Sequence, residues 1–169
     1  LTFSEFNNKI NSLAQHLCEY GVRKGEKIVV YSTRSIETLC SFFAITKLGA
    51  CYVPVDNSIP VERLKVIIND CGAHLLLKMT DKVVIEKNRD VKEINILDSQ
   101  LYCSTQIDVE KNNDCHVDVR DDAYCIYTSG TSGMPKGVLV SHYGIKNIRD
   151  YFLKNYHNDE MNVFLHFAS

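Results

Sequence analysis

The residues that could do chemistry are concentrated between Tyr127 and Val138, in the sequence Tyr-Thr-Ser-Gly-Thr-Ser-Gly-Met-Pro-Lys-Gly-Val. Glycines allow backbone N–H groups to turn toward a ligand and allow the ligand to come close. The hydroxyl side chains add donors whose direction can adjust, and Lys136 adds a positive point charge. Successive N–H groups in such a loop form a concavity that binds anions. The stretch therefore predicts a loop that holds phosphate groups.

The same stretch has a second interpretation as a plain surface turn. Clusters of Ser, Thr, Gly and Pro are frequent in surface loops, and residues 129–133 could be a flexible hairpin connection. The stretch is not a Walker loop, because Gly137 rather than Ser or Thr follows Lys136, and it lacks the Gly-x-Gly-x-x-Gly dinucleotide pattern. Residue chemistry alone leaves the phosphate loop and the plain turn both open.

The segments beside the stretch are typical of strands, at 123–127 and 138–140. A loop between two strands is held on a rigid base, where binding residues are common. Ser141 can cap a long helix that follows. The apolar residues that we expect this helix to turn toward the core are Ile145, Ile148, Tyr151, Phe152 and Tyr156. Residues 161–168 are predicted to form a further strand.

Helices and strands alternate in the earlier part of the chain. Thr2 and Glu5 have the spacing of a helix capping box, Ser35 can cap a second helix, and Pro60 can begin a third. Pro54 indicates that its strand is an edge or terminal segment, because proline has no N–H to donate. Strands are predicted at 26–31, 50–56, 73–79 and 94–97. The alternation predicts an α/β fold, with a doubly wound, mostly parallel sheet and flanking helices.

Composition and charge narrow the class of protein. The chain has 169 residues, of which 45% are hydrophobic and 24% charged, as in one ordinary globular domain. A net charge of −2 gives no sign of a nucleic-acid or membrane partner, and no apolar run approaches the roughly 20 residues of a membrane span. The seven cysteines lack Cys-x-x-Cys spacing, so we predict no metal site and interpret them as buried free thiols of a cytoplasmic protein.

The stretch from Tyr127 to Val138 resembles the phosphate loop of the adenylate-forming, or AMP-binding, enzymes. This superfamily includes acyl-CoA synthetases, luciferases and the adenylation domains of nonribosomal peptide synthetases. Every fixed position of the family pattern is met, with Ser132 where threonine is commoner.

Residues 47–56, followed by Pro60 and Arg63, resemble the second core motif of the same family. The form Tyr-Val-Pro-Val-Asp is most similar to that of peptide-synthetase adenylation domains. Cys51 and Asn57 depart from the usual alanine and proline, and both departures are interpreted as variation in packing or turn geometry.

The resemblance implies that the loop grips the β- and γ-phosphates of ATP. Lys136 is the residue for which it implies a catalytic role. Mg²⁺ would bridge the phosphates, and the family's protein ligand for this ion lies beyond the sequence. His142 also matches a family position, and we expect a structural role for it. The implied phosphate contacts are the side chains of Thr128, Ser129, Thr131, Ser132 and Lys136, with backbone access at Gly130, Gly133 and Gly137.

The resemblance also implies a reaction. The parent enzyme would join an amino acid to AMP with release of pyrophosphate, and then pass the acyl group to the phosphopantetheine thiol of a carrier-protein domain. Two alternatives remain open. One is an acyl-CoA synthetase or a D-alanyl–carrier-protein ligase, and the other is a nucleotide-binding module without catalysis.

The resemblance covers essentially the whole chain but only about the first third of the family's domain. We therefore expect residues 1–169 to be an N-terminal fragment of one adenylation domain, within its large N-terminal subdomain. Its expected parts are a first α/β part at 1–98, a polar and mobile connection at 99–121, and the phosphate loop, helix and following strand at 122–169. Such a fragment is predicted to be inactive alone and to self-associate through an exposed apolar face.

Overall fold

The computed structural model describes residues 1–80, 91–103, 116–129 and 134–155. Its helices are α1 (Phe3–Glu19), α2 (Ile36–Lys47), α3 (Val61–Cys71) and α4 (His142–Asn155), with the short 3-10 helix η1 (Ser99–Tyr102). Its strands are β1 (Lys27–Ser32), β2 (Cys51–Asp56), β3 (Leu75–Lys78), β4 (Lys92–Asn95), β5 (Asp122–Ser129) and β6 (Pro135–Ser141).

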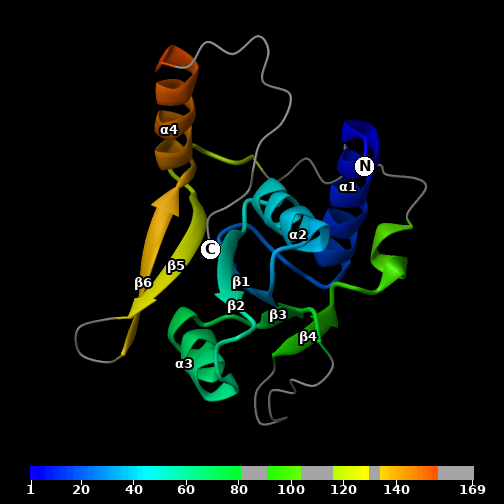
Figure 1. Ribbon diagram of the computed structural model, residues 1–169, viewed down its shortest axis with the longest axis vertical. Coiled ribbons are helices and arrows are strands. Elements are labelled where there is room, and N and C mark those ends of the chain that lie inside the picture. Colours follow the sequence, from blue (N-terminus) through cyan, green and yellow to red (C-terminus); the bar gives the residue numbers. More distant parts are fainter. Residues whose placement is uncertain (81–90, 104–115, 130–133, 156–169) are drawn as a thin grey trace.

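These strands form one sheet in the order β4-β3-β1-β2-β5-β6, with helices along it (Figure 1). Neighbouring strands are parallel except β5 and β6, which are antiparallel. The predicted α/β fold with a mostly parallel sheet is confirmed. The predicted strand at 161–168 lies outside the described residues.

Local sequence signals determine where the helices begin and end. The Thr2 hydroxyl accepts a hydrogen bond from the Glu5 N–H at 3.2 Å, and the Glu5 carboxylate accepts one from the Thr2 N–H at 2.7 Å. This is the predicted capping box. Ser35 caps α2 by accepting a hydrogen bond from the Thr38 N–H at 3.1 Å. Gly72, at a φ of 66°, ends α3 in the left-handed conformation that favours glycine.

Two apolar layers cover the two faces of the sheet, because alternate residues of a strand point to opposite sides. Ile28 and Val30 of β1 belong to the layer that includes residues of α1 and α2. Val29 and Tyr31 of the same strand belong to the layer that includes residues of α3. Figure 1 shows α1 and α2 together on one side and α3 on the other. The helix after β1 and the helix after β2 therefore cover opposite faces.

The prediction from Pro54 that its strand lies at an edge is wrong. β2 is an interior strand, between β1 and β5. The Cys51 N–H donates to the Glu26 carbonyl and the Asn57 N–H to the Ser32 carbonyl, so the odd-numbered residues of β2 bond toward β1. The nitrogen of Pro54 then faces β5, where the described pairing consists of Tyr52 opposite Tyr124. Proline is tolerated because this ladder is short.

The prediction that α4 turns its apolar residues toward the core is also wrong for Ile148, Tyr151 and Phe152, whereas Ile145 is half-buried. Ile148, Tyr151 and Phe152 are 55%, 60% and 54% exposed. The helix follows the edge strand β6 and stands away from α1 and α2 (Figure 1). Tyr156 lies outside the described residues, and self-association through this surface stays a prediction.

The predicted connection at 99–121 is more ordered at its start than expected. Residues 99–102 form η1, in which Leu101 is buried and the Tyr102 hydroxyl donates to the Ile96 carbonyl at 2.9 Å. Residues 104–115 lie outside the described part of the chain. Apolar packing of Leu101 against the layer beside α1 explains the difference.

The described cysteines are all free, and Cys40, Cys51 and Cys125 are buried. Burial raises the pKa of the Cys40 thiol to about 11 and that of Cys51 to about 12. These three thiols stay protonated at neutral pH and act as small apolar side chains, as predicted. The prediction of burial is wrong for Cys103, which is exposed, and Cys18 and Cys71 are only half-buried. None of the described helices is both long and apolar enough to span a bilayer.

Candidate functional site

The predicted phosphate loop is the turn of the β5–β6 hairpin (Figure 1). Thr128 and Ser129 end β5, and Lys136 and Gly137 lie at the start of β6. Residues 130–133 and the side chain of Ser129 lie outside the described structure. The predicted contacts Gly130, Thr131, Ser132 and Gly133 therefore stay predictions, and the structure places the two strands that form the base of the loop.

Thr128 and Lys136 are cross-strand partners in the antiparallel pairing of β5 with β6. Side chains directly opposite each other in such a pair project to the same face, with Cβ atoms about 5 Å apart. Both residues are exposed. One face of the hairpin base thus presents a hydroxyl and an ammonium group side by side, and both can donate hydrogen bonds to a phosphate oxygen.

The opposite face of the hairpin base is packed. Tyr127 and Gly137 are cross-strand partners. The Tyr127 side chain points away from the face that carries Lys136, as would any side chain placed at residue 137. A Cβ atom on Gly137 would lie 2.9 Å from the Cys125 Sγ and 3.0 Å from the Tyr127 Cζ. The glycine was predicted to give a ligand backbone access. The structure adds a packing reason for it, since the Tyr127 ring needs the space.

The Tyr127 hydroxyl donates a 2.5 Å hydrogen bond to the Asp70 carboxylate on α3. Burial of the ring, followed by this hydrogen bond, raises the pKa of Tyr127 above its ordinary value of 10.0. The hydroxyl therefore stays protonated and able to donate at neutral pH. Sequence reasoning did not identify Asp70, because its partner lies 57 residues further along the chain.

A cavity of about 460 Å³ lies beside the hairpin base, at the sheet edge where β1, β2 and β5 end. Ser32 is the last residue of β1 and Asp56 the last of β2, and both line it. The helices that follow these adjacent strands cover opposite faces of the sheet, so the cavity lies at a topological switch point. In α/β proteins this is the usual place for a ligand.

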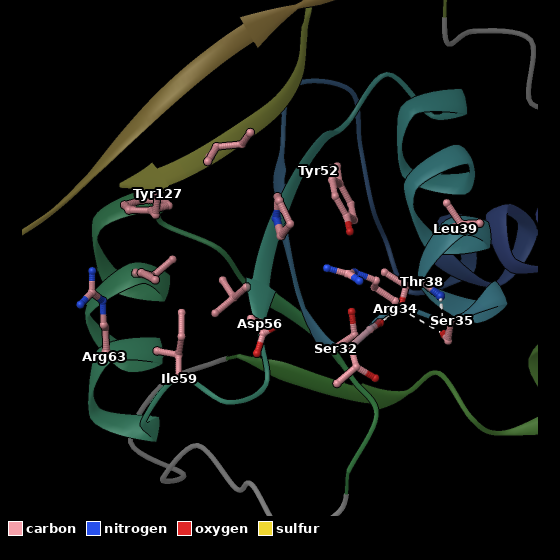
Figure 2. A pocket seen from close by; sticks show the side chains of 15 residues that line it. Ser32, Arg34, Ser35, Thr38, Leu39, Tyr52, Asp56, Ile59, Arg63 and Tyr127 are labelled. Atoms are coloured by element: carbon pink, nitrogen blue, oxygen red, sulfur yellow. Dashed lines mark hydrogen bonds between the residues drawn. The ribbon is translucent and has the colours of Figure 1, made fainter. Parts of the chain in front are cut away.

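The lining of the cavity combines apolar and polar side chains. Figure 2 shows Ser35, the N-cap of α2, and Thr38 of that helix on one side and Ile59 and Tyr127 on the other. Hydrogen bonds from Ser58 hold the pKa of the Asp56 carboxyl below its usual value, and the charge of Arg34 acts in the same direction. An ionised carboxylate and a guanidinium therefore share this lining.

Sequence reasoning noted Asp56 only as part of a family motif and did not assign the cavity. Its lining combines residues from two strand ends, two helices and β5, which lie far apart in sequence. The signal that could have found it is the set of polar residues that directly follow the strands predicted at 26–31 and 50–56. Such residues meet at one edge when the strands are parallel.

His142 begins α4, and its N–H donates to the Asp121 carbonyl at 3.0 Å. The next residue, Tyr143, donates to the Val119 carbonyl at 2.7 Å. Both bonds tie the start of α4 to the segment before β5. The His142 Nε2 is buried and has no hydrogen-bond partner within the described residues. These contacts fit the predicted structural role, which stays a prediction.

A search of the described residues finds no group of three His, Cys, Asp or Glu side chains that could hold a metal ion. The donors placed at the hairpin base are a hydroxyl and an ammonium group, which suit an anion. The described geometry thus fits the binding of a phosphate group by the Thr128 hydroxyl and the Lys136 ammonium group.

Residues 1–169 match the family model described as AMP-binding enzyme. The match extends over the whole chain, which therefore belongs to this family of adenylate-forming ligases. Gramicidin S synthase 2 of Brevibacillus brevis is 37% identical over 157 residues, covering 92% of this chain and 3% of the synthase. The resemblance to nonribosomal peptide synthetases is confirmed.

Two solved structures from Klebsiella oxytoca share the fold. The NpsA N-terminal subdomain, in complex with 3-hydroxybenzoyl-AMSN, has a TM-score of 0.73 at 27% identity, covering 86% of this chain and 35% of that one. NpsA-ThdA, an artificially fused adenylation-PCP di-domain, has a TM-score of 0.74 at 26% identity, covering 86% of this chain and 28% of that one. The chain thus spans a small part of each relative.

Proposed function

We propose that this chain is the N-terminal part of an adenylation domain that activates an amino acid for a peptide synthetase. The observation that supports this most directly is the exposed Thr128–Lys136 pair at the base of the hairpin, in a chain that matches the AMP-binding family throughout. The peptide-synthetase relative supports an amino acid as the substrate class.

In the proposed reaction, a carboxylate oxygen of the amino acid forms a bond to the α-phosphorus of ATP. The bond between the α-phosphorus and the bridging oxygen breaks, and pyrophosphate leaves. Negative charge grows on the leaving group, so preorganised donors aimed at it lower the barrier. Thr128 and Lys136 would contact the β- and γ-phosphates from one face of the hairpin. Ser129, Thr131 and Ser132 are proposed as further phosphate contacts, as the motif implies.

Two further components belong to the proposal. Mg²⁺ would accompany ATP, and we assign it no ligand among the described residues. A carrier domain would bind next to the adenylation domain, and its phosphopantetheine thiol would accept the acyl group. The fused adenylation-PCP di-domain supports a carrier protein as the partner.

The test is ATP–pyrophosphate exchange by the full-length protein with a panel of amino acids, aryl acids and fatty acids. We expect exchange that depends on one or a few amino acids. Lys136→Ala should reduce it about tenfold to a hundredfold, because a charged hydrogen bond contributes roughly 1.5–3 kcal/mol. Lys146→Ala is the matched control, since Lys146 pairs with Asp150 on the surface of α4.

Undiminished exchange in Lys136→Ala would remove this lysine from the mechanism. Exchange that depends on fatty acids would support the acyl-CoA synthetase alternative, and dependence on D-alanine the carrier-protein ligase. ATP binding without exchange would support the non-catalytic module. We expect the 169-residue piece alone to show no exchange.

A further inference from the structure

A side-chain hydrogen bond joins the base of the hairpin to α3. It runs from the Tyr127 hydroxyl to the Asp70 carboxylate, at 2.5 Å. Tyr127 is the last residue of β5 before the Thr128–Lys136 pair, so the bond holds the strand directly beside the donors that face a ligand.

The position of Asp70 is unusual for a helix. It lies in the last turn of α3, where the helix carries partial negative charge and a carboxylate is disfavoured. No basic residue lies in that turn to compensate. The helix therefore gains nothing from this carboxylate, and its described contact is with the hairpin.

The Tyr127 ring is also held from the other side. Gly137 lies opposite it on β6, and a Cβ there would lie 3.0 Å from the Tyr127 Cζ and 3.2 Å from its Oη. The ring thus fills the space between β6 and α3 while its hydroxyl reaches Asp70. The Tyr127 side chain thus fixes the position of both hairpin strands relative to α3.

We propose that Asp70 is a positioning residue for phosphate binding, which acts through Tyr127 to hold Thr128 and Lys136 in place. The inference rests on the function proposed above. Because successive strand residues point to opposite faces, fixing Tyr127 against α3 also fixes the direction in which Thr128 points. A donor that is already aimed needs no reorganisation when charge develops on the leaving group.

The test is ATP–pyrophosphate exchange by the full-length protein, with kcat and KM measured for ATP and for the amino acid. We expect Asp70→Ala and Tyr127→Phe each to lower kcat/KM for ATP by roughly threefold to tenfold, as for one partly exposed hydrogen bond. The kcat/KM for ATP of the double variant should fall no further than that of either single variant, because each single substitution already removes the same hydrogen bond. KM for the amino acid should stay unchanged.

Asp70→Asn should retain most of the activity, since an amide oxygen still accepts a hydrogen bond from the Tyr127 hydroxyl. Glu62→Gln is the control on the same helix, because the Glu62 side chain is 83% exposed and pairs with Lys65 one turn away. Thermal unfolding of each variant shows whether a loss of activity comes from misplaced donors or from loss of the folded structure. A positioning role predicts lower kcat/KM for ATP in protein that is folded at the assay temperature.

The outcomes are distinct. Wild-type protein without exchange would overturn the proposed function, and this inference with it. Active wild-type protein in which Asp70→Ala leaves kcat/KM for ATP unchanged would overturn the inference alone. Equal losses in KM for ATP and for the amino acid, or additive losses in the double variant, would also overturn it.

Discussion

Thr128 on β5 and Lys136 on β6 lie directly opposite each other, and both are exposed on one face of the hairpin. The adjacent cross-strand pair, Tyr127 and Gly137, faces the other way, and there the half-buried Tyr127 side chain donates a hydrogen bond to Asp70 on α3. One face of the hairpin base thus carries the predicted phosphate donors, and the other is bonded to α3.

The Thr128 hydroxyl is predicted to donate to a phosphate oxygen. Thr128→Val keeps the shape of the side chain and removes the hydroxyl, so we expect ATP–pyrophosphate exchange to fall by up to about tenfold. Thr128→Ser keeps the hydroxyl and should retain most of the activity. Steady-state exchange at varied ATP concentration measures both variants. Equal activity of the Val and Ser variants would show that the hydroxyl has no role.

Gly137 is predicted to be intolerant of a side chain. The new Cβ of Gly137→Ala would meet the buried Cys125 Sγ at 2.9 Å, so we expect the free energy of unfolding to fall by about 1–3 kcal/mol. Urea denaturation measures the change. Val138→Ala is the control, because Val138 is the next residue and is 52% exposed. Adding Cys125→Ala should restore part of the loss, and a Gly137→Ala variant as stable as wild type would contradict the packing argument.

Lys78 and Glu93 form an ion pair between β3 and β4, with a 2.5 Å distance from Nζ to Oε2 and side chains only 8% and 18% exposed. Lys78→Met removes the ammonium group while the carboxylate stays largely buried. We expect this change to cost about 3 kcal/mol of the free energy of unfolding. The double variant Lys78→Met/Glu93→Met should recover most of it, because no buried charge remains. A single variant with unchanged stability would contradict this account.

Stability is predicted to fall in alkaline solution. Burial raises the pKa of the Tyr52 hydroxyl from 10.0 to about 12. Between these values the unfolded chain has released this proton while the folded chain still holds it, so the free energy of unfolding declines as pH rises through this window. The raised pKa of Cys51 extends the decline down to about pH 9.

Tyr52→Phe isolates the contribution of one hydroxyl. It should flatten the decline between pH 10 and pH 12 by up to about 1.4 kcal/mol per pH unit. Denaturant titrations at a series of pH values measure the slope. Tyr20→Phe is the control, since Tyr20 is 42% exposed. An identical slope in Tyr52→Phe and wild type would contradict the assignment.

The sequence predicted the parts of the fold that depend on local patterns. Thr2, Glu5 and Ser35 act as caps where their spacing indicated, and the strand runs around Val29, Val53 and Leu76 form the sheet. These signals are local because a cap or a strand face involves residues a few positions apart. The apolar runs at 123–127 and 138–140 likewise predicted β5 and β6.

The relationships that the sequence could not predict join distant residues. Asp70 meets Tyr127 only because β5 lies beside β2, and nothing in either segment specifies that neighbour. The prediction that the strand of Pro54 lies at an edge is wrong for a similar reason. Which neighbour the Pro54 nitrogen faces depends on the order of the strands in the sheet. The burial of α4 was overestimated because an apolar helical face does not specify what covers it.

The missing N–H of Pro54 predicts where the sheet unfolds locally. Because Pro54 has no N–H, β2 cannot donate a hydrogen bond toward β5 at this position. The pairing between β2 and β5 is therefore weakened, and its described register is Tyr52 opposite Tyr124. Hydrogen exchange should therefore divide the protein into two cooperative units, α1 to β4 on one side and the β5–β6 hairpin with α4 on the other. The hairpin is then expected to exchange its amide protons faster than the rest of the sheet, to an extent limited by its bond to Asp70 and by Cys125 in the layer beside α3.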